Sequence, residues 1–314
     1  MRTAFLETLL EVGEDDPNIW LLVGDLGYSV VEPFQKRFPS RFLNVGVAEQ
    51  NMTGIAAGLA LSGKTVFTYS IANFPTLRCL EQIRNDVCYH DANVKIVSVG
   101  GGLSYGSLGS THHGTEDLAI MRALPNIRVV APGDPIEAAL ATRAVAAAPG
   151  PYYLRLGKAG EPAVHVSKPA FELGGAITVR AGRDAAIFTT GGVLPLAAKA
   201  GALLAERGIG VRVLSMHTLK PLDTEAVLAA ARETCGIVTI EEHGPFGALG
   251  EAVAAVLAAA DTSVPFRQVS LPNAFSYAVG SQEHLRRKAG LSVKSLLATV
   301  MQVIQQAEVT DHPR

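Results

Sequence analysis

Two stretches of the sequence combine residue types and spacing suited to proton transfer. In the first, Glu49 is the only acidic residue between Phe42 and Leu61, in FLNVGVAEQNMTGIAAGLAL. A strand is predicted to end at Gly46 and a helix to follow, which places Glu49 on the opening helical turn. Burial favours a protonated carboxyl group and a helix N-terminus favours an ionised one, so a carboxylate at this point is suited to exchanging a proton.

An ordinary structural role for Glu49 is also open, because carboxylates are common at helix starts, where backbone amides satisfy them. From Ile55 to Leu61 the residues are all apolar or small, which predicts a helix buried on every side. Gly54, Ala57 and Gly58 would let a second backbone pack closely, as at an interface between domains or subunits.

The second stretch is the glycine-rich run GGLSYGSLGSTHHG, which contains His112 and His113. A single histidine more often has a structural role. An adjacent pair on a glycine-rich loop is a better candidate for handling protons.

The elements that must position these residues alternate short β-rich runs with longer Ala- and Leu-rich segments, which is typical of a mainly parallel α/β sheet. In the first part of the chain we predict strands at 19–23, 42–45, 65–69, 94–99, 127–131 and 152–156, with helices near 48–61, 76–90, 116–123 and 134–148. In the second part we predict strands at 185–190, 211–215, 237–241 and 266–270, with helices near 195–207, 224–232, 247–260 and 291–307.

The domain boundaries follow from a change in amino-acid composition along the chain. Residues 157–183 hold glycines and prolines and no long helix, which indicates a linker with room for one hairpin. Asp223 is predicted to cap the helix that follows it. We therefore expect two consecutive mainly parallel-sheet α/β domains, at 1–160 and 184–314, joined by a linker at 161–183.

Composition excludes several classes of protein. The chain has 314 residues, 48% hydrophobic and 18% charged, which describes a soluble globular protein with room for two domains. A net charge of −2 without a basic run gives no support for a nucleic-acid partner. No stretch reaches the roughly 18 uncharged apolar residues of a membrane span.

The N-terminal segment and the cysteines indicate the compartment. The start, MRTAFLETLLEVGEDD, is interrupted by Glu7 and Glu11, so it does not have the pattern of a secretory signal. Cys79, Cys88 and Cys235 are an odd, scattered set without a CxxC pair. This set favours a reducing cytoplasm and argues against a disulfide framework or a zinc site.

The segment NVGVAEQNMTGIAAGLAL resembles the pyrimidine-binding domain of transketolases and deoxyxylulose-phosphate synthases, which use thiamine diphosphate. In that family the glutamate after the strand shares a proton with N1′ of the cofactor's aminopyrimidine ring. The resemblance therefore implies that Glu49 activates the cofactor, which requires a carboxyl group held protonatable in a dry site.

The same resemblance assigns further residues to the cofactor. In FTYSIANFPTLRCLEQIRNDV the family places an aromatic ring that stacks on the aminopyrimidine, and Phe74 is the best match, with Tyr69 as an alternative. Core packing is the structural explanation for either ring. Asp25, after the first strand, is assigned to the cofactor end of the site. His112 falls on the family histidine near cofactor and substrate, and His113 replaces the usual glutamine.

The resemblance also implies a site for a phosphorylated substrate. Ser29 and Arg2 match a serine and an arginine that bind the donor's phosphate, and Lys158 stands where the family has an arginine. Lysine still neutralises phosphate, but without the bidentate fork of arginine. Arg155 lies nearby in the sequence and could contribute to the same site.

Two departures put the ordinary fructose or xylulose donor in doubt. Leu108 replaces an aspartate that reads the donor's C2 hydroxyl, and Gly100 replaces a sugar-binding histidine. A phosphorylated ligand remains the expectation.

The rest of the chain resembles the C-terminal domain shared by transketolases and 2-oxoacid dehydrogenase β subunits, on VRVLSMHTLKPLD, IVTIEEHGPFGALGEAVA and LLATVMQVI. In these relatives the domain mainly builds the dimer. His243, in EEHGPFG, could approach the active-site entrance, although a structural role is the simpler interpretation of a loop histidine.

The family's GDG segment, which holds Mg²⁺ and the cofactor's diphosphate, is absent from the sequence. We therefore expect a partner subunit that carries the diphosphate-binding domain and Mg²⁺, with α2β2 as the working assembly. The expected function is a subunit of a split transketolase, moving a two-carbon ketol unit from a ketose to an aldehyde. The alternatives are a 2-oxoacid dehydrogenase β subunit and a non-catalytic scaffold.

Overall fold

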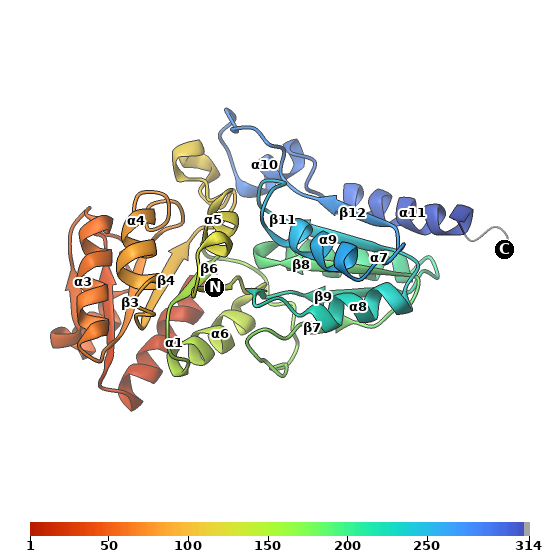
Figure 1. Ribbon diagram of the computed structural model, residues 1–314. Helices are drawn as coiled ribbons and strands as arrows, with labels where there is room; N and C mark the ends of the chain where they lie inside the picture. The colour runs from red at the N-terminus through yellow and green to blue at the C-terminus, as the bar shows by residue number, and fades with distance from the viewer. Residues whose placement is uncertain (311–314) are drawn as a thin grey trace.

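The computed structural model describes residues 1–310 and places them in two α/β domains side by side. Figure 1 shows helix α3 at one end of the molecule and helix α11 at the other. The predicted fold class is confirmed. Among the described residues, no helix is both long and apolar enough to cross a bilayer.

The first domain is built on a sheet of seven strands in the order β10-β5-β6-β4-β3-β1-β2, which are parallel except for β10. Their bounds are β1 Ile19–Val23, β2 Phe42–Asn44, β3 Thr65–Ile71, β4 Val94–Val99, β5 Arg128–Val130, β6 Tyr152–Leu156 and β10 Thr218–Lys220. Its helices are α1 Arg2–Asp15, α2 Glu32–Arg37, α3 Glu49–Leu61, α4 Leu80–Gln82 with a π-helix at Ile83–Cys88, α5 Asp117–Ala123 and α6 Pro135–Ala147.

Helices cover both faces of this sheet, as a parallel sheet requires. Leu21 and Val23 of β1 pack in the cluster formed with α1 and α6, whereas Leu22 packs in the cluster formed with α3. Successive residues of a strand point to opposite faces, so alternate side chains of β1 and β3 belong to different layers.

The second domain has a five-stranded sheet in the order β12-β11-β8-β9-β7. Its strands are β7 Ile177–Arg180, β8 Ala185–Thr190, β9 Val211–Ser215, β11 Ile237–Glu241 and β12 Phe266–Val269. Its helices are α7 Leu194–Ala205, α8 Thr224–Glu233, α9 Leu249–Ala259, α10 Gln282–Lys288 and α11 Val293–Thr310. Asp223 caps α8 as predicted, because its Oδ1 accepts a 2.9 Å hydrogen bond from the amide of Ala226.

The two domains are more interlocked than the predicted boundaries suggest. Strand β10 comes from the second part of the chain but pairs antiparallel with β5 of the first domain. The Lys220 ammonium donates to the carbonyls of Arg122 and Leu124, at the end of α5, which fastens the strand there. This short strand depends on a partner from the first domain, which no local pattern in the sequence indicates.

The predicted linker also differs from the expectation. It contains no hairpin: β7 pairs instead with β9, antiparallel, at the edge of the second sheet. The second sheet therefore begins at Ile177, before the predicted start of the domain at residue 184.

The prediction of a helix buried on every side is wrong for α3. Met52, Ala56 and Ala57 are buried against the sheet, but Gly54, Gly58 and Leu61 are exposed on the other side. The small apolar residues on that face leave the helix open to solvent in the single chain.

Candidate active site

The carboxyl ends of the parallel strands β1, β3 and β4 meet at one edge of the first sheet, where open α/β sheets bind their ligands. Glu49 lies at this edge, at the start of α3, and its side chain is fully buried. A Cβ atom on Gly24, the residue after β1, would lie 3.3 Å from Cγ of Glu49. The backbone at Gly24 therefore approaches the carboxylate closely.

Both oxygens of the Glu49 carboxylate are bound by side chains rather than by helix amides. Ser70 Oγ, on β3, donates to Oε1 over 3.0 Å, and Arg78 Nη1 donates to Oε2 over 2.7 Å. The helix itself has no side-chain cap. The capping explanation for Glu49 is therefore wrong, and its carboxylate is held in place by residues from β3 and the turn after it.

Arg78 connects Glu49 to two other predicted site residues. Its guanidinium carbon lies 4.9 Å from the centre of the Phe74 ring, a cation–π contact. The Phe74 ring meets the His112 imidazole edge-on, with their centres 5.2 Å apart. Glu49, Arg78, Phe74 and His112 thus form one continuous line of contacts across the turn after β3 and the loop before α5.

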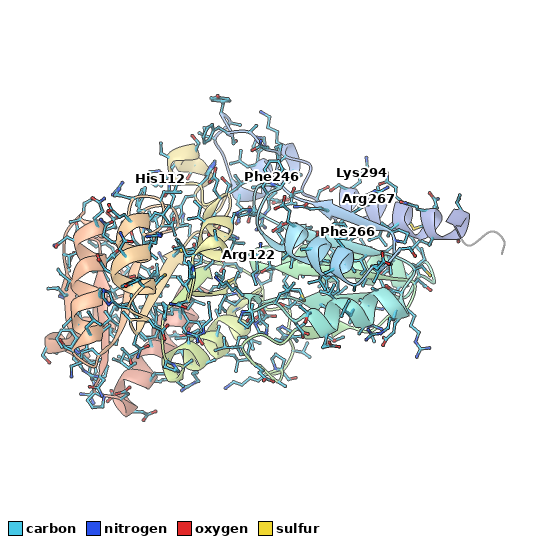
Figure 2. The ribbon with its side chains drawn as sticks, viewed as in Figure 1. His112, Arg122, Phe246, Phe266, Arg267 and Lys294 are labelled. Carbon is cyan, nitrogen blue, oxygen red and sulfur yellow. The ribbon has the colours of Figure 1, made fainter. Side chains whose placement is uncertain are left out.

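The two adjacent histidines face different surroundings. His112 is partly exposed, and its Nδ1 pairs with Oγ1 of Thr111 over 3.0 Å; Figure 2 marks it on the rim of the first domain. His113 is only 4% exposed and lines a cavity of about 560 Å³ between the domains. Burial lowers the pKa of His113, which favours the neutral ring. Among the ring contacts of the described residues, His112 rather than His113 meets Phe74, and the place of His113 at the substrate stays a prediction.

Tyr69 also lies away from this line of contacts. It precedes Ser70 on β3 and therefore points to the opposite face of the sheet. There its ring stacks on Phe5 of α1, with centres 6.2 Å apart, in the hydrophobic core. Core packing thus explains Tyr69.

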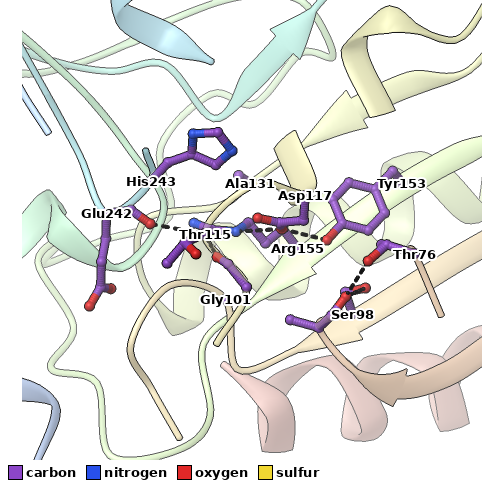
Figure 3. A network of polar contacts seen from close by, with 12 residues as sticks. Thr76, Ser98, Gly101, Thr115, Asp117, Ala131, Tyr153, Arg155, Glu242 and His243 are labelled. Carbon is purple, nitrogen blue, oxygen red and sulfur yellow. Dashed lines mark hydrogen bonds and ion pairs between the residues drawn. The ribbon is translucent and has the colours of Figure 1, made fainter. Parts of the chain in front are cut away.

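Arg155 forms a buried clasp beneath the glycine-rich loop. Its Nε donates to Asp117 over 2.8 Å, and its Nη2 donates to the carbonyls of Gly114 and Glu242. Figure 3 shows Arg155 between Asp117 and Glu242. Tyr153 donates its hydroxyl to the same Asp117 oxygen over 2.6 Å. The clasp ties β6, α5 and the loop after β11 together, which fixes the loop that carries His112.

His243 belongs to the same packed region. It is 1% exposed, its Nε2 accepts from the amide of Ala119, and its Nδ1 contacts the carbonyl of Gly244. Its role is structural, and it does not line an entrance.

Asp25 and Ser29 lie in the turn that follows β1. Both have positive φ angles, 54° and 66°, which are rare for residues with a side chain. Asn44 stabilises Asp25: its side-chain amide donates to Oδ1 of Asp25, and its Oδ1 accepts from the Asp25 amide. The Ser29 amide donates to Glu32, and the Ser29 side chain is exposed.

Lys158 lies over a tyrosine that the sequence did not indicate as functional, and the charge of Arg2 also acts on this tyrosine. The Lys158 ammonium lies 4.9 Å from the centre of the Tyr105 ring. The positive charge of Arg2 lowers the pKa of Tyr105, although burial raises it overall. Tyr105 also packs against Gly100, one of the two positions where the sequence departs from the family pattern.

Sequence reasoning therefore missed Arg78 and Tyr105. The four-residue spacing of Phe74 and Arg78 was the available sign for the first, because such residues often meet on one side of a turn. Nothing local pointed to Tyr105, since its partners come from α1 and from the end of β6.

Comparisons with known proteins identify the family and the fold. Residues 1–160 match the transketolase pyrimidine binding domain and residues 174–296 the transketolase C-terminal domain. The chain is 38% identical to a subunit of the apulose-4-phosphate transketolase of Phocaeicola vulgatus, over 97% of both chains. It is also 38% identical to SqwH, a subunit of the 6-deoxy-6-sulfo-D-fructose transketolase of a Clostridium species, over 98% of this chain and 95% of that one.

A solved structure described as a split gene transketolase, inactive beta4 tetramer, superimposes with a TM-score of 0.88 and 37% identity, over 97% of each chain. The relatives and the structure match nearly the whole length of this chain, and both domain models occur in the order expected. The chain therefore belongs to the transketolase family, as a protein of the kind that carries the pyrimidine-binding and C-terminal domains.

Proposed function

We propose that this chain is the pyrimidine-domain subunit of a heteromeric, thiamine-diphosphate-dependent transketolase. The assembled enzyme would move a two-carbon ketol unit from a phosphorylated or otherwise anionic ketose to an aldehyde. The observation that carries the proposal is the fully buried Glu49 carboxylate, held by Ser70 and Arg78 beside the Phe74 ring.

The residues present fit the aminopyrimidine half of the cofactor. That ring needs a carboxyl group for N1′ and an aromatic face to stack on. Glu49 supplies a buried carboxylate at the edge of the sheet, and Phe74 supplies a partly exposed ring. When bound, thiamine diphosphate supplies the carbon nucleophile and electron sink that ketose cleavage requires.

Each of these side chains has a separate task. Glu49 exchanges a proton with N1′, in a buried position that excludes water. Arg78 and Ser70 hold the carboxylate in one orientation. Phe74 fixes the plane of the pyrimidine, and Asp25 lies at the same edge, behind Gly24. Because Nδ1 of His112 pairs with Thr111, Nε2 is the nitrogen that would serve the substrate.

The partner subunit would supply the diphosphate-binding domain and Mg²⁺. Relatives named as transketolase subunits, and a solved structure described as an inactive beta4 tetramer, support such an arrangement. The exposed face of α3, with Gly54, Gly58 and Leu61, gives the partner a surface close to Glu49. Two-fold symmetry makes α2β2 the working stoichiometry, and the scattered cysteines support a cytoplasmic location.

The substrate end of the site is assigned to Arg2, Lys158 and Ser29. Two relatives are named for ketoses that end in a phosphate or a sulfonate. Two cationic side chains at the same edge of the sheet suit either group, because both are tetrahedral oxyanions.

Reconstitution tests the proposal. The chain is combined with a diphosphate-domain subunit, thiamine diphosphate and Mg²⁺, and ketol transfer from ketoses to aldehydes is measured. We expect activity from the complex and none from this chain alone. Full activity of the chain alone would refute the split-subunit assignment. Decarboxylation of 2-oxo acids without ketose cleavage would indicate the dehydrogenase class, and a complex that does not bind the cofactor would indicate a scaffold.

A further inference from the structure

Tyr105 covers the backbone of Gly100, which directly follows β4. Gly100 has a φ angle of +84°, and a Cβ atom there would lie 2.1 Å from Cε2 of Tyr105 and 2.3 Å from its Cδ2. No side chain fits at position 100 while the ring is in place. The volume is filled instead by an aromatic ring from the glycine-rich loop.

The Tyr105 ring also faces a cation. The ammonium of Lys158, which follows β6, lies 4.9 Å from the ring centre. Attraction between an ammonium and the negative face of the ring stabilises this position. Tyr105 is therefore held between the backbone of Gly100 and the Lys158 ammonium, while Lys158 itself stays exposed.

Arg2, at the start of α1, brings a second positive charge to the same place. Its charge acts on the phenols of both Tyr69 and Tyr105, and its side chain also hydrogen-bonds Tyr69. These effects partly oppose the rise in the pKa values of the two tyrosines that burial causes. The Nε of Arg2 is buried and has no hydrogen-bond partner among the described residues. A buried donor without an acceptor is unusual in a folded protein, and a bound ligand is one way to satisfy it.

Within residues 1–310, no carboxylate pairs with the cations of this cluster. Among the ion pairs of residues 1–310, none involves Arg2 or Lys158. Three segments that are distant in sequence thus bring two cations and a phenol to one edge of the sheet. This combination is suited to an oxyanion, because charge and a neutral hydroxyl donor can bind its oxygens together.

We propose that Tyr105 is a substrate-binding residue that sets specificity for a ketose ending in a tetrahedral oxyanion. Its hydroxyl donates to the oxyanion that Arg2 and Lys158 attract, and its ring limits the depth of the subsite above Gly100. This deepens the proposed function and rests on it for the identity of the substrate as a ketose. Phosphate monoesters and sulfonates share the required chemistry.

Binding to the full-length chain tests the proposal without its partner. Isothermal titration is carried out with three ketoses that differ only at C6: D-fructose 6-phosphate, 6-deoxy-6-sulfo-D-fructose and D-fructose. We expect at least one of the two anionic sugars to bind and D-fructose to bind at least about tenfold more weakly. The anion that binds more tightly identifies the group that the subsite prefers.

The variant Tyr105→Phe keeps the ring and removes only the hydroxyl. We expect it to weaken binding of the preferred anion about tenfold, as the loss of a hydrogen bond to a charged group does. Tyr89→Phe, at a tyrosine that is 81% exposed, serves as the matched control and should bind like the wild type.

The proposal is overturned if Tyr105→Phe binds the anionic sugars as tightly as the wild type, or if neither anion binds the wild-type chain. It is also overturned if the variant loses D-fructose and the anions to the same extent. Absence of ketol transfer in the reconstituted complex would instead refute the proposed function, while oxyanion binding to this chain would stand.

Discussion

Arg78 donates a 2.7 Å hydrogen bond to Glu49, and of the two only the arginine reaches solvent: its side chain is 46% exposed and that of the glutamate is fully buried. The buried Glu49 carboxylate thus has a counter-ion, the Arg78 guanidinium, that is half exposed to solvent. The same guanidinium lies over the Phe74 ring. The residue that stabilises the carboxylate therefore also contacts the ring that we propose stacks on the cofactor.

This relationship predicts a coupling between the two side chains in the stability of the chain. Arg78→Gln leaves the Glu49 carboxylate buried without a cation, so we expect a loss of about 1–2 kcal/mol, below the range for fully buried pairs because Arg78 is half exposed. In a Glu49→Gln background the same change should cost much less, since no charge is left unpaired. Urea unfolding of the four proteins of this cycle measures the coupling.

The matched control for this cycle is Arg287→Gln, at an exposed pair with Glu283 whose side chains are 59% and 81% exposed. It should change the unfolding free energy by no more than about 0.5 kcal/mol. Equal costs of Arg78→Gln with and without Glu49 would show that the ion pair does not stabilise the fold.

Catalysis by the assembled enzyme should depend on Glu49 far more than its assembly does. Glu49→Gln keeps the shape of the side chain but cannot exchange a proton at N1′, so we expect turnover to fall by roughly 10²–10⁴-fold. Ketol transfer is measured in the complex, and size-exclusion chromatography checks that both subunits still associate. Glu81→Gln, at an exposed carboxylate on α4, should keep wild-type turnover. Undiminished turnover in Glu49→Gln would refute the proposed role of Glu49 in proton exchange with the cofactor.

The clasp beneath the glycine-rich loop should be costly to break. In Asp117→Asn, the buried Arg155 loses its only carboxylate partner among the described residues, and breaking such a pair costs about 3 kcal/mol or more. Denaturant unfolding measures the loss. Glu233→Gln, at a carboxylate that is 53% exposed and paired with Arg212, is the control and should cost less than about 1 kcal/mol. Similar losses in both variants would mean that the clasp adds no stability beyond a surface ion pair.

The burial of His217 leads us to expect that the free energy of unfolding falls at acidic pH. Its ring is fully buried and stacks on Phe171 with centres 4.1 Å apart, and burial lowers its pKa to about 4. The unfolded chain takes up a proton near pH 6.5, whereas the folded chain does so only near pH 4. The unfolded state therefore binds more protons in this window, and the unfolding free energy falls as pH falls, by up to about 3 kcal/mol.

Urea unfolding between pH 7 and pH 4 checks this expectation. The unfolding free energy of His217→Gln should depend less steeply on pH than that of the wild type. The control His90→Gln, at an exposed histidine, should match the wild type. His165 acts in a different window: its hydrogen bond to Glu137 raises its pKa, so its contribution is lost as pH rises above 6.5. Identical slopes for wild type and His217→Gln below pH 6.5 would contradict the prediction.

Short-range patterns in the sequence were enough to predict most of the architecture. The strands from β1 to β6 and the cap of α8 by Asp223 depend on alternation, helical periodicity and local capping, which involve residues close together in the chain. The position of Glu49 between a strand and a helix is of the same kind. The family resemblance added the proposed roles of Glu49, Phe74 and His112, because their motifs are continuous stretches.

Only the tertiary structure decided which side chains meet. It placed Tyr69 in the core and Ser70 against Glu49, because neighbouring residues of a strand point to opposite faces of the sheet. It took Arg155 into the clasp with Asp117, a partner 38 positions away. It joined Arg2, Tyr105 and Lys158 from three distant segments, and it paired β10 with a strand of the other domain. Such contacts depend on how whole elements pack, and no local pattern in the sequence specifies that packing.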